Sequence, residues 1–166
     1  MTGLIIALFG IVLAVVLAGF GSIVAVGSVG QTSNGVMSEE PELFGKLLLL
    51  TALPGTQGIY GFLVGFIGIV KLGLLVGGED APWRILVQSG SASFSKGLEF
   101  FLACVPIALA GFFSAIHQGR VCATGVTMTA KQPDQMGKAL VLGVFVEFYA
   151  ILGLLISILL INSIQF

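Results

Sequence analysis

Four long apolar segments alternate with three short polar segments along the chain. The apolar segments run over about residues 4–30, 44–76, 91–128 and 136–164. Each is longer than the roughly 20 residues that an α-helix needs to cross the hydrocarbon of a bilayer. The pattern therefore predicts an all-α protein with four transmembrane helices, and the even number of crossings places both termini on one side of the membrane.

Composition narrows the class further. Of the 166 residues 57% are hydrophobic and 9% are charged, whereas a soluble domain has about 25% charged residues. The net charge of −1 provides no basic surface for nucleic acid, so we expect no nucleic-acid partner. The first segment is too long for a signal peptide and lacks its basic start, so we expect a retained helix. These features predict a multi-pass protein of the cell membrane.

The chain contains an internal repeat. The first loop reads GVMSEEPELFGKLLLL and the third reads GVTMTAKQPDQMGKALVL, so that Pro41 matches Pro133 at an offset of 92 residues. A Gly-Lys pair follows each proline at the same spacing. We therefore predict a duplicated helical hairpin, with residues 1–80 as the first transmembrane hairpin and residues 81–166 as the second. Repeats of this kind favour a site at the repeat interface or a larger symmetric array.

Small residues crowd the first apolar segment, which is rich in Gly, Ala and Ser from Gly10 to Ser28. Small residues allow membrane helices to approach closely. Their number exceeds what one helix pair requires and favours a position on the inner wall of a ring. We therefore expect several copies of the chain to assemble into a ring.

One carboxylate lies inside an apolar segment. Glu147 follows eight uncharged residues of the fourth segment, and a charge at such a depth costs about 2.5–3.5 kcal/mol on the insertion scale. Gln118 and Glu147 are equidistant from the predicted hairpin tip at Gln132 and Pro133, so the two side chains can face each other. We interpret Glu147 as a cation-binding residue; the alternative is a protonated structural glutamate.

The second segment supplies neutral oxygen atoms. Leu53, Thr56, Gln57 and Tyr60 are spaced i, i+3, i+4 and i+7, which places them on one helix face. Pro54 lacks an N–H group and disturbs the preceding turn, and such distortion can present a backbone carbonyl to an ion. One carboxylate with several neutral oxygens suits a hard cation. A proton needs only the carboxylate, so this set favours Na⁺.

One spacing does not fit the repeat. Gln57 lies 12 residues after Gly45, whereas Glu147 lies 10 residues after Gly137. The register between loop and site therefore differs by two residues, and either a different loop height or a distortion near Pro54 can account for it.

The remaining reactive residue types do not form a catalytic or cofactor-binding motif. Cys104 and Cys122 fall in one predicted helix about 27 Å apart, too far for a disulfide. His117 lies beside Gln118 but about 100° around the helix, where we expect a packing or interfacial role. We therefore predict neither catalytic residues nor a bound organic cofactor.

Three segments together resemble a known family. LPGTQGIYGF at 53–62, IHQGR at 116–120 and VEFYAILG at 146–153 are similar to the four-helix rotor proteolipid of bacterial and archaeal V/A-type ATPases. The resemblance implies a rotor-ring protein that carries Na⁺ across the membrane, coupled to ATP hydrolysis or synthesis in the soluble sector. The ligands it implies are the Leu53 carbonyl, Thr56, Gln57, Gln118 and Glu147, with Tyr60 hydrogen-bonded to the carboxylate.

The resemblance also implies partners. These are further copies of the chain, a stator subunit with an essential arginine, the central-stalk subunits and membrane lipid. Two alternatives remain open at this point. The same ring could carry H⁺ instead of Na⁺, or the chain could be a small four-helix proton-coupled multidrug antiporter.

Overall fold

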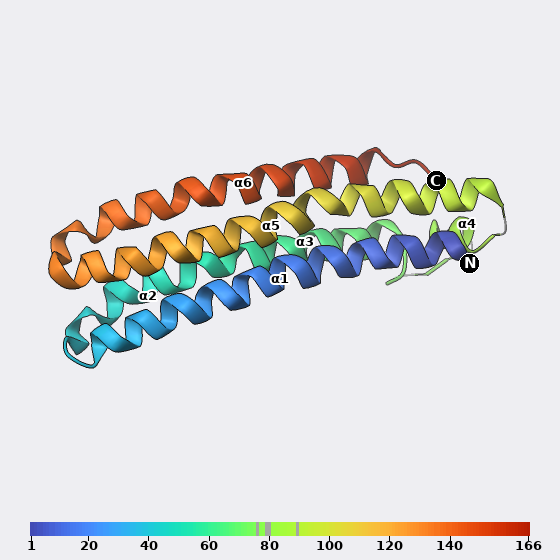
Figure 1. The fold of residues 1–166 in the computed structure, drawn as a ribbon. Helices are drawn as coiled ribbons and strands as arrows, with labels where there is room; N and C mark the ends of the chain where they lie inside the picture. The colour runs from blue at the N-terminus through green and yellow to red at the C-terminus, as the bar shows by residue number, and fades with distance from the viewer. Residues whose placement is uncertain (76, 79–80, 89) are drawn as a thin grey trace.

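Four long helical arms run antiparallel to one another (Figure 1). The computed structural model describes residues 1–75, 77–78, 81–88 and 90–166. The elements in chain order are α1 (Thr2–Met37), η1 (Pro41–Leu43), α2 (Phe44–Ala52), η2 (Leu53–Gly55), α3 (Thr56–Lys71), α4 (Trp83–Val87), α5 (Ser91–Lys131), η3 (Pro133–Gln135) and α6 (Met136–Ser163). All four arms are long and apolar enough to cross a membrane, which confirms the prediction of an all-α fold with four spans.

The two ends of the bundle differ. Both termini lie at one end, and the turns that join α1 to α2 and α5 to α6 lie at the other (Figure 1). We call the latter the tip end. There the Lys46 Nζ donates a hydrogen bond of 3.0 Å to the Pro133 carbonyl, which ties the two hairpins together. The α5–α6 turn lies between Lys131 and Met136 and contains the predicted tip at Gln132 and Pro133.

Small residues bring α1 and α5 into close contact. A Cβ atom on Gly21 of α1 would lie 2.7 Å from the Phe112 carbonyl oxygen of α5, so only glycine fits there. In the second layer, α3 packs on α1 at Gly61, and α6 packs on α5 at Gly153. The bundle therefore has two layers, a close-packed α1/α5 layer and a covering layer formed by α2, α3 and α6.

The first helix is longer than the sequence predicts. We expected it to end near Gly30, but it continues to Met37. The additional turns are held by the covering layer, because the buried Ser33 forms a 2.8 Å hydrogen bond with Thr51 and Val29 packs in the core of the tip end. Polar residues beyond Gly30 are compatible with a helix that extends past the membrane.

The second arm ends earlier than predicted. We expected it to reach Val76, a residue outside the described ones, but α3 ends at Lys71. Gly73 adopts a left-handed φ of 70°. Its N–H bonds the Val70 carbonyl, and the Leu74 N–H bonds the Ile69 carbonyl. This is the glycine-terminated helix end known as the Schellman motif.

Two further features of this region were not fully predicted. The short helix α4 follows the second arm, in a segment that we expected to be a loop. The expected boundary between the hairpins after residue 80 lies beside residues 79–80, which are outside the described ones. The other long helices match more closely, since α5 extends three residues beyond the predicted Met128 and α6 ends at Ser163.

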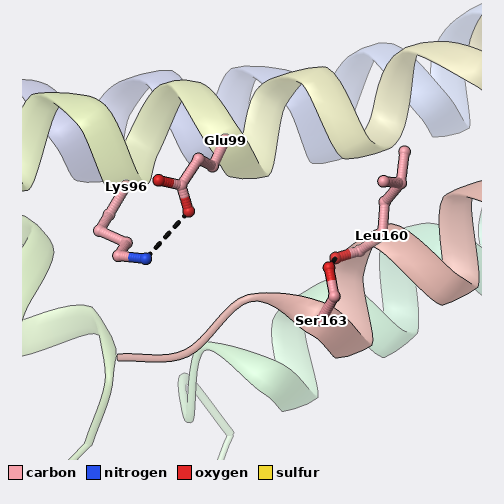
Figure 2. A network of polar contacts seen from close by, with 4 residues as sticks. All are labelled: Lys96, Glu99, Leu160 and Ser163. Carbon is pink, nitrogen blue, oxygen red and sulfur yellow. Dashed lines mark hydrogen bonds and ion pairs between the residues drawn. The ribbon is translucent and has the colours of Figure 1, made fainter.

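Polar side chains mark the end of the bundle that carries the termini. Lys96 and Glu99 form an ion pair of 3.0 Å on α5, and within α6 the Ser163 hydroxyl donates a hydrogen bond of 2.8 Å to the Leu160 carbonyl (Figure 2). Glu99, Leu160 and Ser163 line a hollow between the two helices. Lys71 donates to the Asn162 carbonyl at 3.3 Å. The contacts of Lys71 and Ser163 lie where the apolar surfaces of α3 and α6 end.

Candidate ion-binding site

The site begins with a break in the second arm. Pro54 has no N–H group, and the chain passes through the 3₁₀ turn η2 before helix α3 begins at Thr56. Within this turn the Thr56 N–H bonds the Leu53 carbonyl. The first turn of a helix leaves N–H groups without intrahelical partners, and one of them, on Gly58, donates a 2.8 Å hydrogen bond to Ser22 of α1. The break therefore holds Thr56 and Gln57 in a fixed position.

Glu147 reaches this break from α6. Its side chain is buried, with 7% of the residue exposed. The Thr56 hydroxyl lies 2.7 Å from Oε1 and the Tyr60 hydroxyl donates to the same atom at 2.6 Å. Two residues of the first hairpin thus contact the carboxylate of the second, as the sequence predicts.

The two glutamines complete the site, and both are fully buried. The Gln57 amide nitrogen donates to Gln118 Oε1. The Gln118 amide nitrogen donates to the Gly143 carbonyl at 3.0 Å and lies 3.5 Å from Glu147 Oε2. Gln118 therefore faces Glu147, as its distance from the tip predicts, but it presents its nitrogen to the carboxylate instead of its oxygen.

Several oxygen atoms converge on the Thr56 hydroxyl. The Thr56 hydroxyl oxygen lies 2.9 Å from the Leu53 carbonyl, 3.5 Å from Gln57 Oε1 and 2.7 Å from Glu147 Oε1. A threonine hydroxyl has a single proton and can donate to only one of the three. A cation satisfies several such oxygens at once, so the chemistry of this set fits a hard cation.

The register difference between the hairpins is largely taken up by side chains. Thr56, and not Gln57, contacts the carboxylate directly, and it lies only one residue out of register with Glu147. Gln57 reaches the carboxylate through Gln118.

Two serines belong to the site and were missed by the sequence analysis. Ser114 of α5 donates a 2.9 Å hydrogen bond to the Val146 carbonyl and lies 3.5 Å from the Gln57 amide nitrogen. Ser22 accepts from Gly58, as described above. Ser22 and Ser114 are separated by 92 residues, the repeat offset, and this signal could have identified them as a pair.

Other candidate residues lie outside this cluster. His117 is exposed in a groove between α5 and α6 that also includes Phe113 and Tyr149. Cys104 and Cys122 are buried free thiols on α5. Among the described residues, no group of three His, Cys, Asp or Glu side chains could hold a metal ion. The oxygen cluster therefore depends on one carboxylate with neutral partners.

Comparison with known proteins gives the family. The family model for the C subunit of ATP synthase matches twice, at residues 9–68 and 101–160, which confirms the duplicated hairpin and its offset. The chain is 37% identical over 159 residues to the V-type sodium ATPase subunit K of Enterococcus hirae, covering 96% of this chain and 92% of that protein. It is 40% identical over 157 residues to the A-type ATP synthase subunit K of Methanocaldococcus jannaschii, covering 95% of this chain and 62% of that protein.

These matches remove the antiporter alternative and confirm a multi-pass integral membrane protein. They also place the chain among the ion-translocating subunits of rotary ATPases and not among the catalytic ones. The chain therefore belongs to the family of the ATP synthase C subunit, as a rotor proteolipid of the V/A type.

Proposed function

We propose that this rotor proteolipid binds Na⁺ and carries it across the membrane. The ligands are the Leu53 carbonyl, Thr56, Gln57, Gln118 and Glu147, and Tyr60 supports the carboxylate. The observation that carries the proposal is the convergence of oxygen atoms from Leu53, Gln57 and Glu147 on the Thr56 hydroxyl. The similarity to a V-type sodium ATPase subunit K supports the choice of ion.

Na⁺ binding also requires one local change. Gln118 now directs its amide nitrogen toward the carboxylate and the Gly143 carbonyl. For Gln118 to contribute its oxygen, the amide rotates by half a turn and gives up the Gly143 bond. Gln57 then loses an acceptor in Gln118 and keeps its contact with Ser114. The site thus exchanges a hydrogen-bonded arrangement for an ion-bound one without a movement of the backbone.

Several copies form the rotor ring, with the α1/α5 layer inside. Close packing at positions such as Gly21 gives this layer the smaller width that an inner wall requires. The apolar groove between α5 and α6 then faces the adjacent copy. In this arrangement the two helices that carry Thr56 and Glu147 belong to the outer wall.

Charge neutralisation couples binding to rotation. An empty, ionised Glu147 is costly within hydrocarbon, so it remains near a stator subunit that offers an arginine. Na⁺ binding removes the net charge and allows the loaded site to pass through lipid. Central-stalk subunits transmit the rotation to or from the sector that hydrolyses or makes ATP.

A proton-carrying ring is the second candidate. Thr56, Tyr60 and Gln118 surround both carboxylate oxygens, and this set can also hold a glutamic acid without a metal ion. The alternative differs from the Na⁺ proposal in one respect, because the neutral oxygens of Leu53 and Gln57 then have no role in transport.

Carbodiimide labelling separates the two ions. The reagent modifies a protonated carboxyl group, so bound Na⁺ should protect Glu147 at fixed pH. We expect Na⁺, but not choline, to slow the labelling of the purified oligomer, and we expect Glu147→Gln to remove the labelled peptide. Labelling that is independent of Na⁺ at every pH tested supports the proton-carrying ring.

A further inference from the structure

Within one copy, α1 packs very closely on α5. A Cβ atom on Gly111 of α5 would lie 2.9 Å from the Cβ atom of Ala18 on α1. Farther toward the tip, a Cβ atom on Gly119 would lie 2.8 Å from the Cβ atom of Ala25. These two pairs define the face that each helix uses for the contact and the register between the helices.

The repeat relates this contact to the surface between two copies. The two hairpins match the same family model at an offset of 92 residues, so α5 is the second-repeat equivalent of α1. Ala110 of α5 occupies the position that Ala18 has in α1, and His117 is likewise equivalent to Ala25. A head-to-tail contact that closes into a ring repeats from copy to copy. In such a ring, α5 meets α1 of the next copy with the face that α1 presents to α5.

The partner residues on α1 follow from the same offset. Gly19 is equivalent to Gly111, and Gly27 is equivalent to Gly119. Among the described residues of a single copy, a Cβ atom on Gly19 or on Gly27 would meet nothing within 4 Å. The face of α1 that corresponds to the contact face of α5 is therefore available to another copy.

The two faces match in chemistry. An open groove of about 670 Å³ between α5 and α6 includes Ala110, Phe113 and His117, and its other lining residues are largely apolar. Helix α1 carries an exposed apolar stripe at helical spacing, which consists of Ile5, Phe9, Val12, Val16, Phe20 and Ile23. An apolar surface of this extent on a single chain marks an interaction site. Because the repeat pairs the groove with the stripe, a second copy is the occupant that fits.

The contact between copies cannot be as close as the contact within a copy. Inside a copy, a Cβ atom on Gly10 of α1 would lie 2.7 Å from the Phe101 Cα atom, so only glycine fits there. The residue equivalent to Gly10 on α5 is Leu102. The Leu102 side chain needs space that the spacing within a copy does not provide.

The same conflict occurs at a second level. A Cβ atom on Gly21 would lie 2.7 Å from the Phe112 carbonyl oxygen, yet the residue equivalent to Gly21 is Phe113. Gly10 and Gly21 are 11 residues apart, or about 16 Å along the helix. The distance between two helix axes depends on the side chains at their contact. The inner helices of adjacent copies must therefore lie farther apart than those of one copy along much of their length.

We propose that the groove of each copy holds α1 of the next copy in the register set by the repeat, and that this joint is wider than the α1/α5 contact within a copy. Ala110 then lies against Gly19 of the next copy, and His117 lies against Gly27. The inner wall of the ring alternates between close and wide spacings, and side chains such as Phe113 fill the wide ones. This inference rests on the proposed ring with the α1/α5 layer inside and does not depend on which ion is carried.

Disulfide cross-linking of purified rings tests the register. Ala110→Cys is combined with Gly19→Cys, and the oxidised chains are separated on a denaturing gel. A joint slightly wider than the contact within a copy brings the two Cβ atoms to about the 3.5–4.5 Å that a disulfide requires. We expect a ladder of covalent oligomers, because each copy is joined to two neighbours.

Mismatched and single variants are the controls for this ladder. Ala110→Cys with Gly27→Cys is displaced by eight residues, or about 12 Å, and should remain monomeric. Each single variant should also remain monomeric, because both native cysteines are buried. A ladder of equal strength from the mismatched pair would overturn the register. Dimers of Ala110→Cys alone would place two grooves face to face and would also overturn it.

Alanine substitutions test the width of the joint. Gly111→Ala and Gly119→Ala add a methyl group to the close contact, so we expect the ring to dissociate in detergent at a clearly lower temperature. Gly19→Ala and Gly27→Ala add the same group at the equivalent positions of the joint, and we expect a dissociation temperature close to that of the native ring. An equal loss in both pairs, or no loss in either pair, would overturn the difference in spacing.

The outcomes can be told apart from failure of the proposed function. If the native chain forms no ring, the proposed function and this inference fail together. If the native ring forms and binds its ion while the matched cysteines do not cross-link, only this inference fails. If Gly111→Ala and Gly119→Ala yield no ring, Gly19→Ala and Gly27→Ala still decide, because their rings are compared with the native one.

Discussion

The two hairpins share one scaffold, yet they differ in a segment of three residues that lies at the site. In the first hairpin Leu53–Gly55 form the 3₁₀ turn that interrupts the arm. The corresponding residues of the second, 92 positions on, are 145–147, and there α6 runs without a break. Glu147 thus occupies the position of Gly55. One copy presents backbone and neutral oxygens, and the other presents the charge.

This difference shows how duplication can build a site that neither half could build alone. A second carboxylate at residue 55 would place two like charges within a few ångströms of each other in a medium of low dielectric. A second break in α6 would remove the rigid helix that positions Glu147. Because one hairpin supplies neutral ligands and the other supplies the carboxylate, each four-helix protein has a single charge at the site. One monovalent cation can neutralise that charge.

The hairpins remain alike in the residues that support the site. Ser22 and Ser114 occupy equivalent positions in the two repeats, and both lie on the α1/α5 layer. Ser22 contacts the covering arm of its own hairpin, and Ser114 contacts the covering arms of both hairpins. Ser22 satisfies a backbone N–H after the break, while Ser114 bonds the Val146 carbonyl and lies near Gln57. The scaffold thus retains its polar anchors while the ligands diverge.

The largest expected effect comes from removing the charge of the second hairpin. Glu147→Gln preserves the shape of the side chain but has no charge to balance a cation. We expect loss of measurable Na⁺ binding and transport in an assembled ring, assayed with radioactive Na⁺. Glu99→Gln removes an exposed carboxylate near the termini and serves as the control. Na⁺ binding by Glu147→Gln at the native affinity would show that the charge of the second hairpin is not required, and would contradict the division of roles between the hairpins.

Removal of a neutral ligand from the first hairpin should have the next largest effect. Gln57→Ala deletes one of the proposed oxygen ligands of Na⁺. We expect the Kd for Na⁺ to rise by about 30-fold, because a polar contact to a charged group contributes about 1.5–3 kcal/mol. Gln31→Ala, an exposed glutamine on α1, should leave Kd unchanged. An unaltered Kd in Gln57→Ala would show that Gln57 is not a ligand.

Removing the break from the first hairpin, so that its second arm resembles α6, should weaken Na⁺ binding moderately. Pro54→Ala restores an N–H group and allows the arm to continue as an α-helix through residues 53–55. The Leu53 carbonyl then points along the helix axis and accepts from the Gln57 N–H, and we expect Kd to rise by about tenfold, or about 1.4 kcal/mol. Pro106→Ala is the matched control, since Pro106 lies inside α5 but outside the site. Equal Na⁺ affinities in both variants would argue against a role for the break.

The smallest effects are expected at the two serines. Ser114→Ala removes a hydrogen bond near Gln57 and should raise Kd by up to about fivefold, given a net value near 1 kcal/mol for one bond. Ser22→Ala acts only through the Gly58 backbone and should raise it less. Ser157→Ala, which loses a bond to the Ile107 N–H away from the site, controls for general destabilisation. A larger effect in Ser157→Ala than in Ser114→Ala would remove Ser114 from the site.

Much of this arrangement was predictable from the sequence. Glu147 is conspicuous because charge is rare in apolar segments, and Gln118 follows from its equal distance to the tip. The spacing of Thr56 and Tyr60 places both on the face that meets the carboxylate. These predictions succeeded because helix geometry converts sequence distance into depth and direction with little ambiguity.

Other features depend on tertiary contacts that the sequence pattern does not encode. The continuation of α1 to Met37 depends on the Ser33–Thr51 contact, which joins residues of two helices. The orientation of the Gln118 amide depends on which carbonyl is nearby, and Gly143 provides it. Ser114 is one of many small residues in α5, and only its position relative to Val146 and Gln57 separates it from the others.

The most direct test is a high-resolution structure of the purified oligomer in Na⁺ buffer and in choline buffer. We predict a cation bounded by the Leu53 carbonyl, Thr56, Gln57 and Glu147 in Na⁺ alone, with the Gln118 amide turned to present its oxygen. Identical density in the two buffers, with Glu147 held only by the Thr56 and Tyr60 hydroxyls, would contradict Na⁺ binding at this site.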